Sequence, residues 1–411
     1  MSAVDSAPSW LSDLRANALL EYGNTPAPSD EEEVWRYSRI SDVDLGAFSP
    51  VASQAARPSI SNVPDGATVV DVVDGRIVSI SAGDLGKATV QALADHTDGA
   101  SLYGATRANP DAVGLLHDAN VGDVVVVDVP RAAAVDSLII IDTWSDAAGG
   151  LSCPHTIIRA AAGSSVTVLE RRRSGDAEQL VLPVVEIDAA PDARVGYLVV
   201  QELGRNTISL ETHTSQADQQ AHVVSSVAAF GGSYARTQAN FRLIGRGASG
   251  DLLSAYFGDG DQMLDFRTFQ EHAAPDTTSN LLFKGAVTGA AQSVYTGLIR
   301  VSEDAPGTNA FQTNRNLKLS DDAWAYSVPN LEIEQNQVSC SHASTVGEID
   351  EDQRFYLESR GVPTTIAEQL LVSGFFAEVI GQMPVDAVKA ELQATIDAAL
   401  AADRAAQEVA A

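Results

Sequence analysis

The chain has 411 residues, of which 45% are hydrophobic, and a formal net charge of −29. This length predicts two or three domains or one long solenoid, and the hydrophobic fraction excludes wholesale disorder. Because 55 acidic residues outnumber 26 basic ones, the surface repels phosphate. The charge therefore argues against nucleic acid and against an anionic membrane as partners.

Lysine occurs only four times, so arginine supplies the other 22 of the 26 basic residues. An acidic, lysine-poor chain is typical of a cytosol with molar salt, where the Debye length falls to about 3 Å and carboxylate repulsion is screened. We therefore interpret the composition as halophilic, of the haloarchaeal type. An ordinary acidic protein is the alternative.

The two cysteines, Cys153 and Cys340, are too few for a disulfide framework. Residues 1–14 contain no basic segment followed by an apolar one, so we expect no secretory signal there. No apolar run approaches the roughly 18 residues of a membrane helix. Together these features predict a cytoplasmic protein in a reducing compartment.

Residues 1–98 are predicted to form an N-terminal region of mixed structure. Helix is expected up to about residue 45, because residues 29–32 read Ser-Asp-Glu-Glu, a capping box. A linker rich in Pro, Ser and Ala follows at 46–66. The segment 69–80 contains two β-rich runs joined by Asp-Gly, and this pattern predicts a hairpin with a type I′ turn.

Residues 99–348 are predicted to form the β-rich core. From Gly122 onward, short β-rich runs recur about every 10 to 15 residues, with Gly, Asn and Asp between them and no long helical pattern. More than a dozen such strands exceed an ordinary sandwich. We therefore expect a β-helix, which stacks short strands turn upon turn, although no strict hexapeptide period is present.

Residues 349–411 are predicted to be helical. Residues 350–353 read Asp-Glu-Asp-Gln, a capping signature, and Gly361 marks the end of that first helix. A second helix should carry an apolar stripe of five residues: Ile366, Leu370, Leu371, Phe375 and Val379. A third helix should begin near Pro384, and its Ala-rich end after Leu400 should fray.

Motifs for nucleotide or calcium chemistry are missing from the sequence. The segment 83–88 resembles a phosphate-binding loop only in its Gly-Lys pair and lacks the hydroxyl that would hold Mg²⁺. Asp259, Asp261 and Asp265 lack the spacing of a calcium loop. The run Arg171–Arg173 is expected to pair with local carboxylates.

The triplet Cys340-Ser-His342 is the candidate metal-ligating motif. On a strand, residues i and i+2 point to the same face, so a thiolate and an imidazole there can address one soft metal or iron–sulfur cluster. The alternative is a buried Cys beside a hydrogen-bonded His. Because a cluster normally takes four ligands, a site here must borrow ligands from another chain.

Several segments together resemble the SufB/SufD family of iron–sulfur cluster assembly proteins. The matching segments, specific within about residues 231–380, are 256–272, 279–285, 329–334, 340–342 and 350–361. The triplet Trp35-Arg36-Tyr37 is similar to an early Trp-Arg-Tyr element of the family, whereas the middle strands are similar only in pattern.

Two positions resemble the SufD branch of that family. SufB-like chains carry a Cys in a Thr-Gln-Cys-Asp segment where this chain has Asn314, and they carry Glu-His-Glu where it has Cys340-Ser-His342. One departure from the SufD pattern is Ala343-Ser344 after the histidine.

The resemblance implies a right-handed parallel β-helix core flanked by N-terminal and C-terminal helical regions. It implies a non-enzymatic scaffold subunit that pairs with SufB and docks the SufC ATPase through its C-terminal helices, so that SufC hydrolyses the ATP. A transient iron–sulfur cluster would form at the SufB interface, with His342 as the carried-over ligand and Cys340 as an auxiliary ligand or a packing residue. Flavin binding is implied for the family's complex, but no motif places it.

Two groups of residues are expected at these interfaces. Pro329, Leu331 and Ile333 should help to form a β-edge shared with SufB, because an uncapped turn of a β-helix offers unpaired strand groups. Some apolar residues of the helical arm should pack on the end of the β-helix, and the others should meet the ATPase. The arm residues considered for this surface are Ile366, Leu370, Phe375 and Phe376.

Two other functions stay open at this point: a SufB-type scaffold that hosts a cluster by itself, and a β-helix carbohydrate-active enzyme. Asn314 argues against the first, because an amide is a poor ligand for cluster iron. The missing secretory signal and the helical C-terminal arm argue against the second.

Overall fold

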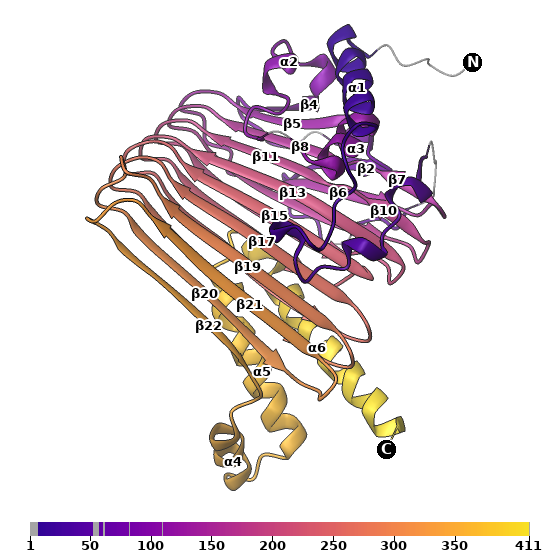
Figure 1. Cartoon of the computed structure of the whole chain (residues 1–411), viewed down its shortest axis with the longest axis vertical. Helices are drawn as coiled ribbons and strands as arrows, with labels where there is room; N and C mark the ends of the chain where they lie inside the picture. The colour runs from indigo at the N-terminus through magenta and orange to yellow at the C-terminus, as the bar shows by residue number, and fades with distance from the viewer. Residues whose placement is uncertain (1–6, 52–56, 61, 82, 109, 411) are drawn as a thin grey trace.

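The computed structural model describes residues 7–51, 57–60, 62–81, 83–108 and 110–410. Its core is a solenoid of about eight turns, in which two long sheets face each other and helices flank the solenoid at both ends of the chain (Figure 1). The predicted mainly-β architecture is therefore confirmed. Within the described residues, no helix combines the length and the hydrophobicity that a membrane span requires.

The two sheets alternate along the chain, because successive strands belong to opposite walls of each turn. The first sheet contains β1 (Ser49–Pro50), β4 (Thr89–Ala92), β5 (Val124–Val129), β7 (Gly150–Ser152), β8 (His155–Ala160), β10 (Gln179–Val181), β11 (Val184–Ala189), β13 (Thr207–Ala217), β15 (Tyr234–Leu243), β17 (Met263–His272), β19 (Gln292–Val301) and β21 (Trp324–Ile333). The second contains β2 (Thr68–Val73), β3 (Arg76–Ser81), β6 (Ile139–Ser145), β9 (Ser165–Ser174), β12 (Arg194–Glu202), β14 (His222–Ala229), β16 (Ser249–Gly258), β18 (Thr278–Val287), β20 (Asn309–Lys318) and β22 (Ser339–Gly347).

Buried side chains fill the lumen between the sheets. In the N-terminal turns they are mainly β-branched, which suits a strand that is buried on its inner face. Examples are Val125, Val127, Ile139, Ile141, Ile158 and Val168. Fully burying one such side chain stabilises the fold by about 1.5–3 kcal/mol.

Toward the C-terminal end, aromatic rings fill the lumen. Tyr256, Phe266, Phe283 and Tyr295 form successive ring contacts, with centroids 4.5, 5.7 and 5.5 Å apart. Gly285 makes room for this packing, because a Cβ there would lie 1.9 Å from the Tyr256 ring. We call these four side chains the aromatic core.

The arginine run at 171–173 alternates between the lumen and the outside, as strand geometry requires. The middle arginine lies in the lumen and forms ion pairs with Glu170 and Glu211 at 2.6 and 2.8 Å. The flanking arginines point outward, where they pair with Glu391 of the last helix and with Asp142. The predicted pairing with local carboxylates is confirmed.

The expected N-terminal helix up to residue 45 is wrong, because helix α1 (Ser9–Tyr22) is followed only by short turns. Residues 29–32 do form capping-box hydrogen bonds of 3.2 Å. The turns that follow are η1 (Glu33–Trp35), η2 (Ile40–Asp42) and η3 (Leu45–Ala47). Side chains of Arg236 and Arg267 donate to the carbonyls of Val34 and Arg36, which a continuing helix would have used itself.

The predicted hairpin is confirmed in β2 and β3. Asp74 and Gly75 have φ angles of 48° and 75°, as a type I′ turn requires. The linker predicted at 46–66 lies partly outside the described residues, and its described part includes β1 and Arg57, which pairs with Asp142 at 2.7 Å. The short elements η4 (Leu93–Asp95), α2 (Gly99–Leu102) and α3 (Ala112–Asn120) then lead into the solenoid.

Three helices form the C-terminal arm: α4 (Glu351–Ser359), α5 (Thr364–Ile380) and α6 (Asp386–Ala410). The predicted cap of α4 is confirmed, since the Asp350 carboxylate accepts from the Gln353 N–H at 2.9 Å. Helix α6 is assigned as far as Ala410, and the expected fraying after Leu400 stays a prediction.

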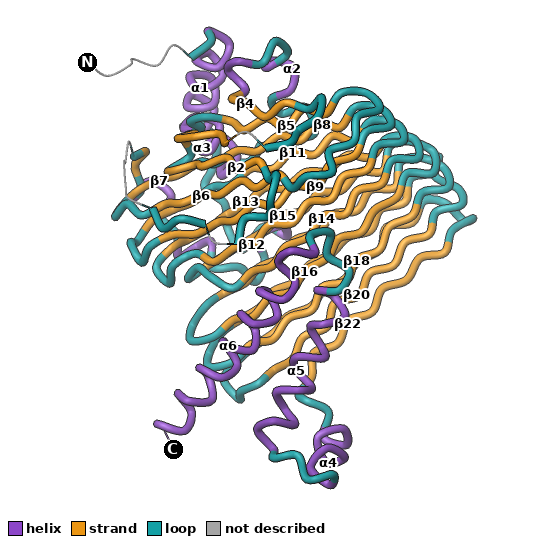
Figure 2. The backbone as a smooth tube through the Cα atoms, turned by 180° about the vertical axis from the view of Figure 1, so that it is seen from behind, coloured by secondary structure: helices purple, strands orange, loops and turns teal. Residues whose placement is uncertain are grey.

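The arm packs on the outer face of the second sheet rather than on the end of the β-helix, which corrects that expectation (Figure 2). Sheet residues such as Leu198 and Phe257 meet Val372 and Phe376 of α5 there. Lys284 of β18 is buried, and its ammonium group binds the Phe375 carbonyl oxygen at 2.8 Å and the Glu378 carboxylate. Helix α4 has no buried residue and projects from the body (Figure 1).

Replacing Gly285 with Ala should destabilise the fold, because the added methyl group collides with the Tyr256 ring. Overpacking of this kind costs about 1–3 kcal/mol. Urea denaturation should show a lower midpoint for this variant. The control is Gly347→Ala on β22, where a Cβ meets nothing within 4 Å and the midpoint should not change. Equal midpoints for both variants would contradict the described packing of the lumen.

Candidate functional site

The last turn of the solenoid is open. Strand β21 ends the first sheet and β22 ends the second, so within the described chain no further strand pairs with their outer edges (Figure 1). Unpaired backbone N–H and C=O groups on such an edge are a template for another strand. The open turn is therefore a candidate surface for a partner that continues the sheets.

The structure brings five predicted residues together on the inward face of this open turn. On β21, Pro329, Leu331 and Ile333 lie in register with Gly297, Ile299 and Val301, of which the last two are buried in the solenoid. On β22, Cys340 and His342 share one face. We call this set the terminal face: Pro329, Leu331, Ile333, Cys340 and His342.

Cys340 and His342 differ in their surroundings. Cys340 is half-buried and packs near Leu331 and Ile299. This burial raises the pKa of the Cys340 thiol, so the protonated form, which is a poor metal ligand, is favoured at neutral pH. His342 is exposed, and within the described chain its ring has no hydrogen-bond partner. His342 is therefore the side chain of the pair that is free to bind a ligand.

Asn314 is not available as a third ligand. It is fully buried one turn below the terminal face, where its amide donates to the Tyr256 hydroxyl at 3.1 Å and to the Phe283 carbonyl at 3.4 Å. Its Oδ1 accepts a hydrogen bond of 2.8 Å from Asn316. Among the residues that the structure places, no group of three His, Cys, Asp or Glu side chains is arranged to hold a metal ion.

A rim of exposed apolar side chains surrounds the open turn, and sequence analysis missed it. Trp324 and Tyr326 lie on the outer face of β21, and Tyr326 stacks on Tyr37 with ring centroids 5.3 Å apart. Phe311 and Val346 are exposed on the second sheet. The signal in the sequence is the spacing of Trp324 and Tyr326, since aromatic residues at i and i+2 of a last strand share one face.

On the helical arm, the predicted partner residues separate into exposed and buried ones. Ile366 and Leu370 are 45% and 53% exposed, whereas Phe375 is half-buried beside Lys284. Phe376 is fully buried against the second sheet, so it has no surface to offer a partner. The buried face of α5 thus differs from the predicted stripe: it consists of Ala367, Val372, Phe376, Val379 and Ile380.

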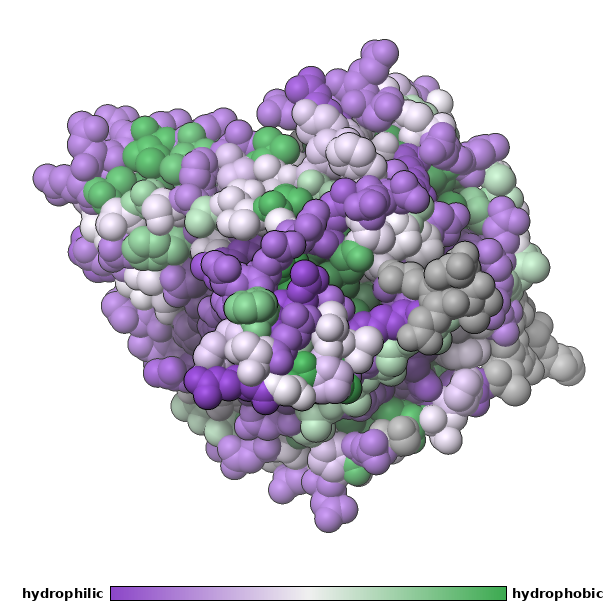
Figure 3. Space-filling view, turned by 90° about the horizontal axis from the view of Figure 1, so that it is seen from below, coloured by the Kyte–Doolittle hydropathy of each residue, from purple (hydrophilic) through white to green (hydrophobic). Residues whose placement is uncertain are grey.

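Sequence analysis also missed two aromatic residues on α4. Phe355 and Tyr356 are 69% and 57% exposed on α4, the helix before the one that carries Ile366 and Leu370. We call these four residues the arm patch. Figure 3 views the molecule from below and shows apolar areas set among a hydrophilic surface.

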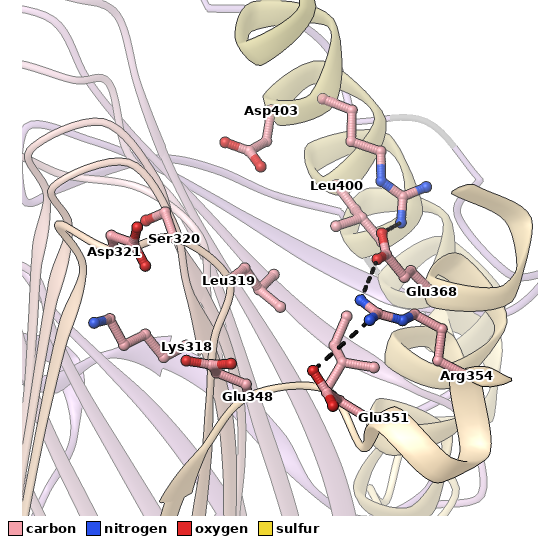
Figure 4. Close-up of a pocket in the computed structure, with 12 residues that line it drawn as sticks. Lys318, Leu319, Ser320, Asp321, Glu348, Glu351, Arg354, Glu368, Leu400 and Asp403 are labelled. Atoms are coloured by element: carbon pink, nitrogen blue, oxygen red, sulfur yellow. Dashed lines mark hydrogen bonds and ion pairs between the residues drawn. The ribbon is translucent and has the colours of Figure 1, made fainter. Parts of the chain in front are cut away.

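A pocket of about 230 Å³, lined by charged side chains, lies between the C-terminal end of the solenoid and the root of the arm (Figure 4). Lys318 and Glu348 line it on the solenoid side. On the helical side, Glu368 of α5 bridges Arg354 of α4 and Arg404 of α6, each at 3.3 Å. These ion pairs hold the three helices of the arm together at its root.

Comparison with known proteins gives the family. A family model described as SUF system FeS cluster assembly, SufBD core domain, matches residues 143–375, more than half of the chain. The chain belongs to the SufBD family. An iron–sulfur cluster assembly SufBD family protein of Mycobacterium tuberculosis is 36% identical over 281 residues, which cover 66% of this chain and 70% of that protein.

Two further relatives match almost the whole chain. The iron–sulfur cluster assembly protein SufD of Bacillus subtilis is 25% identical over 412 residues, covering 95% of this chain and 94% of that protein. The chloroplastic protein ABCI7 of Arabidopsis thaliana is 25% identical over 405 residues, covering 93% and 85%. The match to a protein named SufD over almost the whole chain agrees with the SufD-type motifs of the sequence.

The Cys340 thiol should react slowly with iodoacetamide at pH 7.5, because its raised pKa leaves little thiolate. The rate should keep rising above pH 8.5, the ordinary pKa of a free thiol. Mass spectrometry after timed labelling measures this rate. Cys153 is fully buried and should stay unmodified, so Cys340→Ala should abolish labelling of the folded chain. A rate that levels off below pH 8 would contradict the assignment.

Proposed function

We propose that this chain is a SufD-type scaffold subunit for iron–sulfur cluster assembly in the cytoplasm. Its open last turn pairs with a SufB-type subunit, and a transient cluster forms between the two. Its helical arm docks the SufC ATPase, which hydrolyses the ATP. The observation that carries the proposal is the terminal face, where an imidazole without a hydrogen-bond partner in the described chain lies on a strand whose outer edge is unpaired.

Strand addition is the mode of pairing that fits the open turn. Main-chain hydrogen bonds from β21 and β22 to a partner's strands supply affinity, and the inward side chains supply specificity. Leu331 is half-buried and Ile333 is exposed, so a further turn stacked on them would bury apolar surface from water. A SufB-type solenoid would present such a turn.

The chemistry of the terminal face suits half of a cluster site. A neutral imidazole is a ligand for iron, and a cluster is normally held by four protein ligands. His342 supplies one ligand here, and the thiol of Cys340 is held protonated by burial unless iron displaces its proton. The remaining ligands would come from the SufB-type partner, so the cluster is cargo shared between subunits rather than a resident group of this chain.

The arm patch suits a protein partner. Four exposed apolar residues lie on helices α4 and α5, and α4 projects away from the solenoid. Large exposed apolar side chains grouped in this way mark interaction sites. We assign this surface to the ATPase, with Phe375 at its margin and Phe376 left out because it is buried.

A SufB-type scaffold that hosts a cluster alone is the second candidate, and the engagement of Asn314 with Tyr256 and Phe283 weighs against it. No observation favours a carbohydrate-active enzyme. We assign no residue to the flavin that the resemblance implies, and the proposed function requires none.

Substituting His342 with Ala should lower the cluster content of the purified complex several-fold, because one of the four ligands is lost. Iron and sulfide per complex, together with the visible absorption spectrum, measure the content. Cys340→Ala should have a milder effect. Ser341→Ala, which changes the opposite face of the same strand, is the control. Undiminished cluster in the His342→Ala complex would remove the ligand role.

Substituting Phe355 and Leu370 with Ser should weaken capture of the ATPase about tenfold or more, because the docking surface loses two apolar side chains whose burial favours binding. Affinity measurement with the purified ATPase tests this. Leu20→Ser on α1 is the matched control, since Leu20 is 69% exposed on a distant helix. Point substitutions are preferable to deleting the arm, because deletion would uncover the apolar outer face of the second sheet. Unchanged affinity would overturn the docking assignment.

A further inference from the structure

Gln312 of β20 carries an unused hydrogen-bond acceptor at the mouth of the lumen. The side chain is only 1% exposed, and its Nε2 donates to the Tyr295 hydroxyl. Its Oε1 is buried and has no partner. Gly297 makes room for the amide, because a Cβ there would lie 1.7 Å from Nε2. A buried acceptor without a donor destabilises the fold, so this oxygen needs an explanation.

The residue stacked on Gln312 in the next turn is His342. The two lie in register on the parallel strands β20 and β22, which places their backbones about 4.8 Å apart with side chains on the same face. His342 is exposed and, within the described chain, makes no hydrogen bond. An unused acceptor and an imidazole with an unused N–H group are therefore neighbours.

We infer that Gln312 is a positioning residue for His342: when iron binds one ring nitrogen, the other ring N–H is donated to Gln312 Oε1. This inference rests on the proposed function. A histidine that binds a metal almost always donates its second N–H to an acceptor, which fixes the tautomer and the orientation of the ring. Loss of such an acceptor typically weakens metal binding 10- to 100-fold.

Gln270 of β17 provides an internal comparison. It is also fully buried in the lumen, its amide donates to Ser279 at 2.9 Å, and its Oε1 also has no partner. Its register neighbours are Phe241 and Ile299, neither of which has a side-chain N–H. Gln270 thus shares the burial of Gln312 but has no imidazole stacked on it, which makes it a matched control.

The test is a double-substitution cycle on the cluster-loaded complex with the SufB-type partner. The measured quantity is the rate at which iron is lost to the chelator ferrozine. Gln312→Leu should speed the loss about tenfold, while Gln312→Glu, which keeps an acceptor oxygen, should restore slow loss. In the Gln312→Leu variant the Tyr295 hydroxyl keeps its hydrogen bond to the Thr268 hydroxyl at 3.0 Å, so it is not left without a partner. Gln270→Leu should have no effect.

The decisive comparison is the effect of Gln312→Leu in a His342→Ala background, where it should vanish. An equal effect in both backgrounds, or none with His342 present, would overturn the inference and leave the proposed function standing. If His342→Ala alone leaves the rate unchanged, the proposed function fails and the inference falls with it. Melting temperatures of all variants check that each one folds.

Discussion

In-register stacking of turns is the constraint on which the rest of this structure depends. Each inward side chain lies directly on the one below, so every turn buries the turn before it and is buried by the next. Among the described residues, no further strand stacks on the last turn. Its strands keep free edges and its inward residues stay accessible, which is why Cys340 and His342 lie at a surface although their register partners are buried.

The ion pairs that hold the helical arm on the second sheet follow from the same stacking. Outward positions of the second sheet form continuous rows, and the helices cover the rows with apolar residues. Lys284 and the first arginine of the run at 171–173 reach out of these rows to Glu378 and Glu391. The arm is thereby held on the sheet whose last strand carries His342, so the two proposed partner surfaces belong to one continuous layer.

Much of this fold could be predicted from the sequence, because strand spacing, the Asp74-Gly75 turn and the Asp350 cap are local signals. The prediction of a helix after residue 29 was wrong. The capping box at residues 29–32 forms, but Arg236 and Arg267, which are distant in sequence, donate to the backbone carbonyls that a continuing helix would use. The placement of Cys340 and His342 on one face of a strand followed from strand periodicity. Other features depend on which turns and faces of the solenoid are covered, and no local sequence pattern encodes this coverage. These features are the proximity of Cys340 to Leu331, the burial of Phe376 and the exposure of Phe355.

The aromatic core limits the routes by which iron and sulfide could reach the terminal face. Tyr256, Phe266, Phe283 and Tyr295 lie buried in the lumen behind the terminal face, so within the described chain their rings occlude that part of the interior. Under the proposed function, iron and sulfide can arrive only sideways or through the facing subunit. Under the same proposal, a finished cluster leaves through the interface between the two subunits. Release of the cluster would then depend on separation of the two solenoids, not on transport along either lumen.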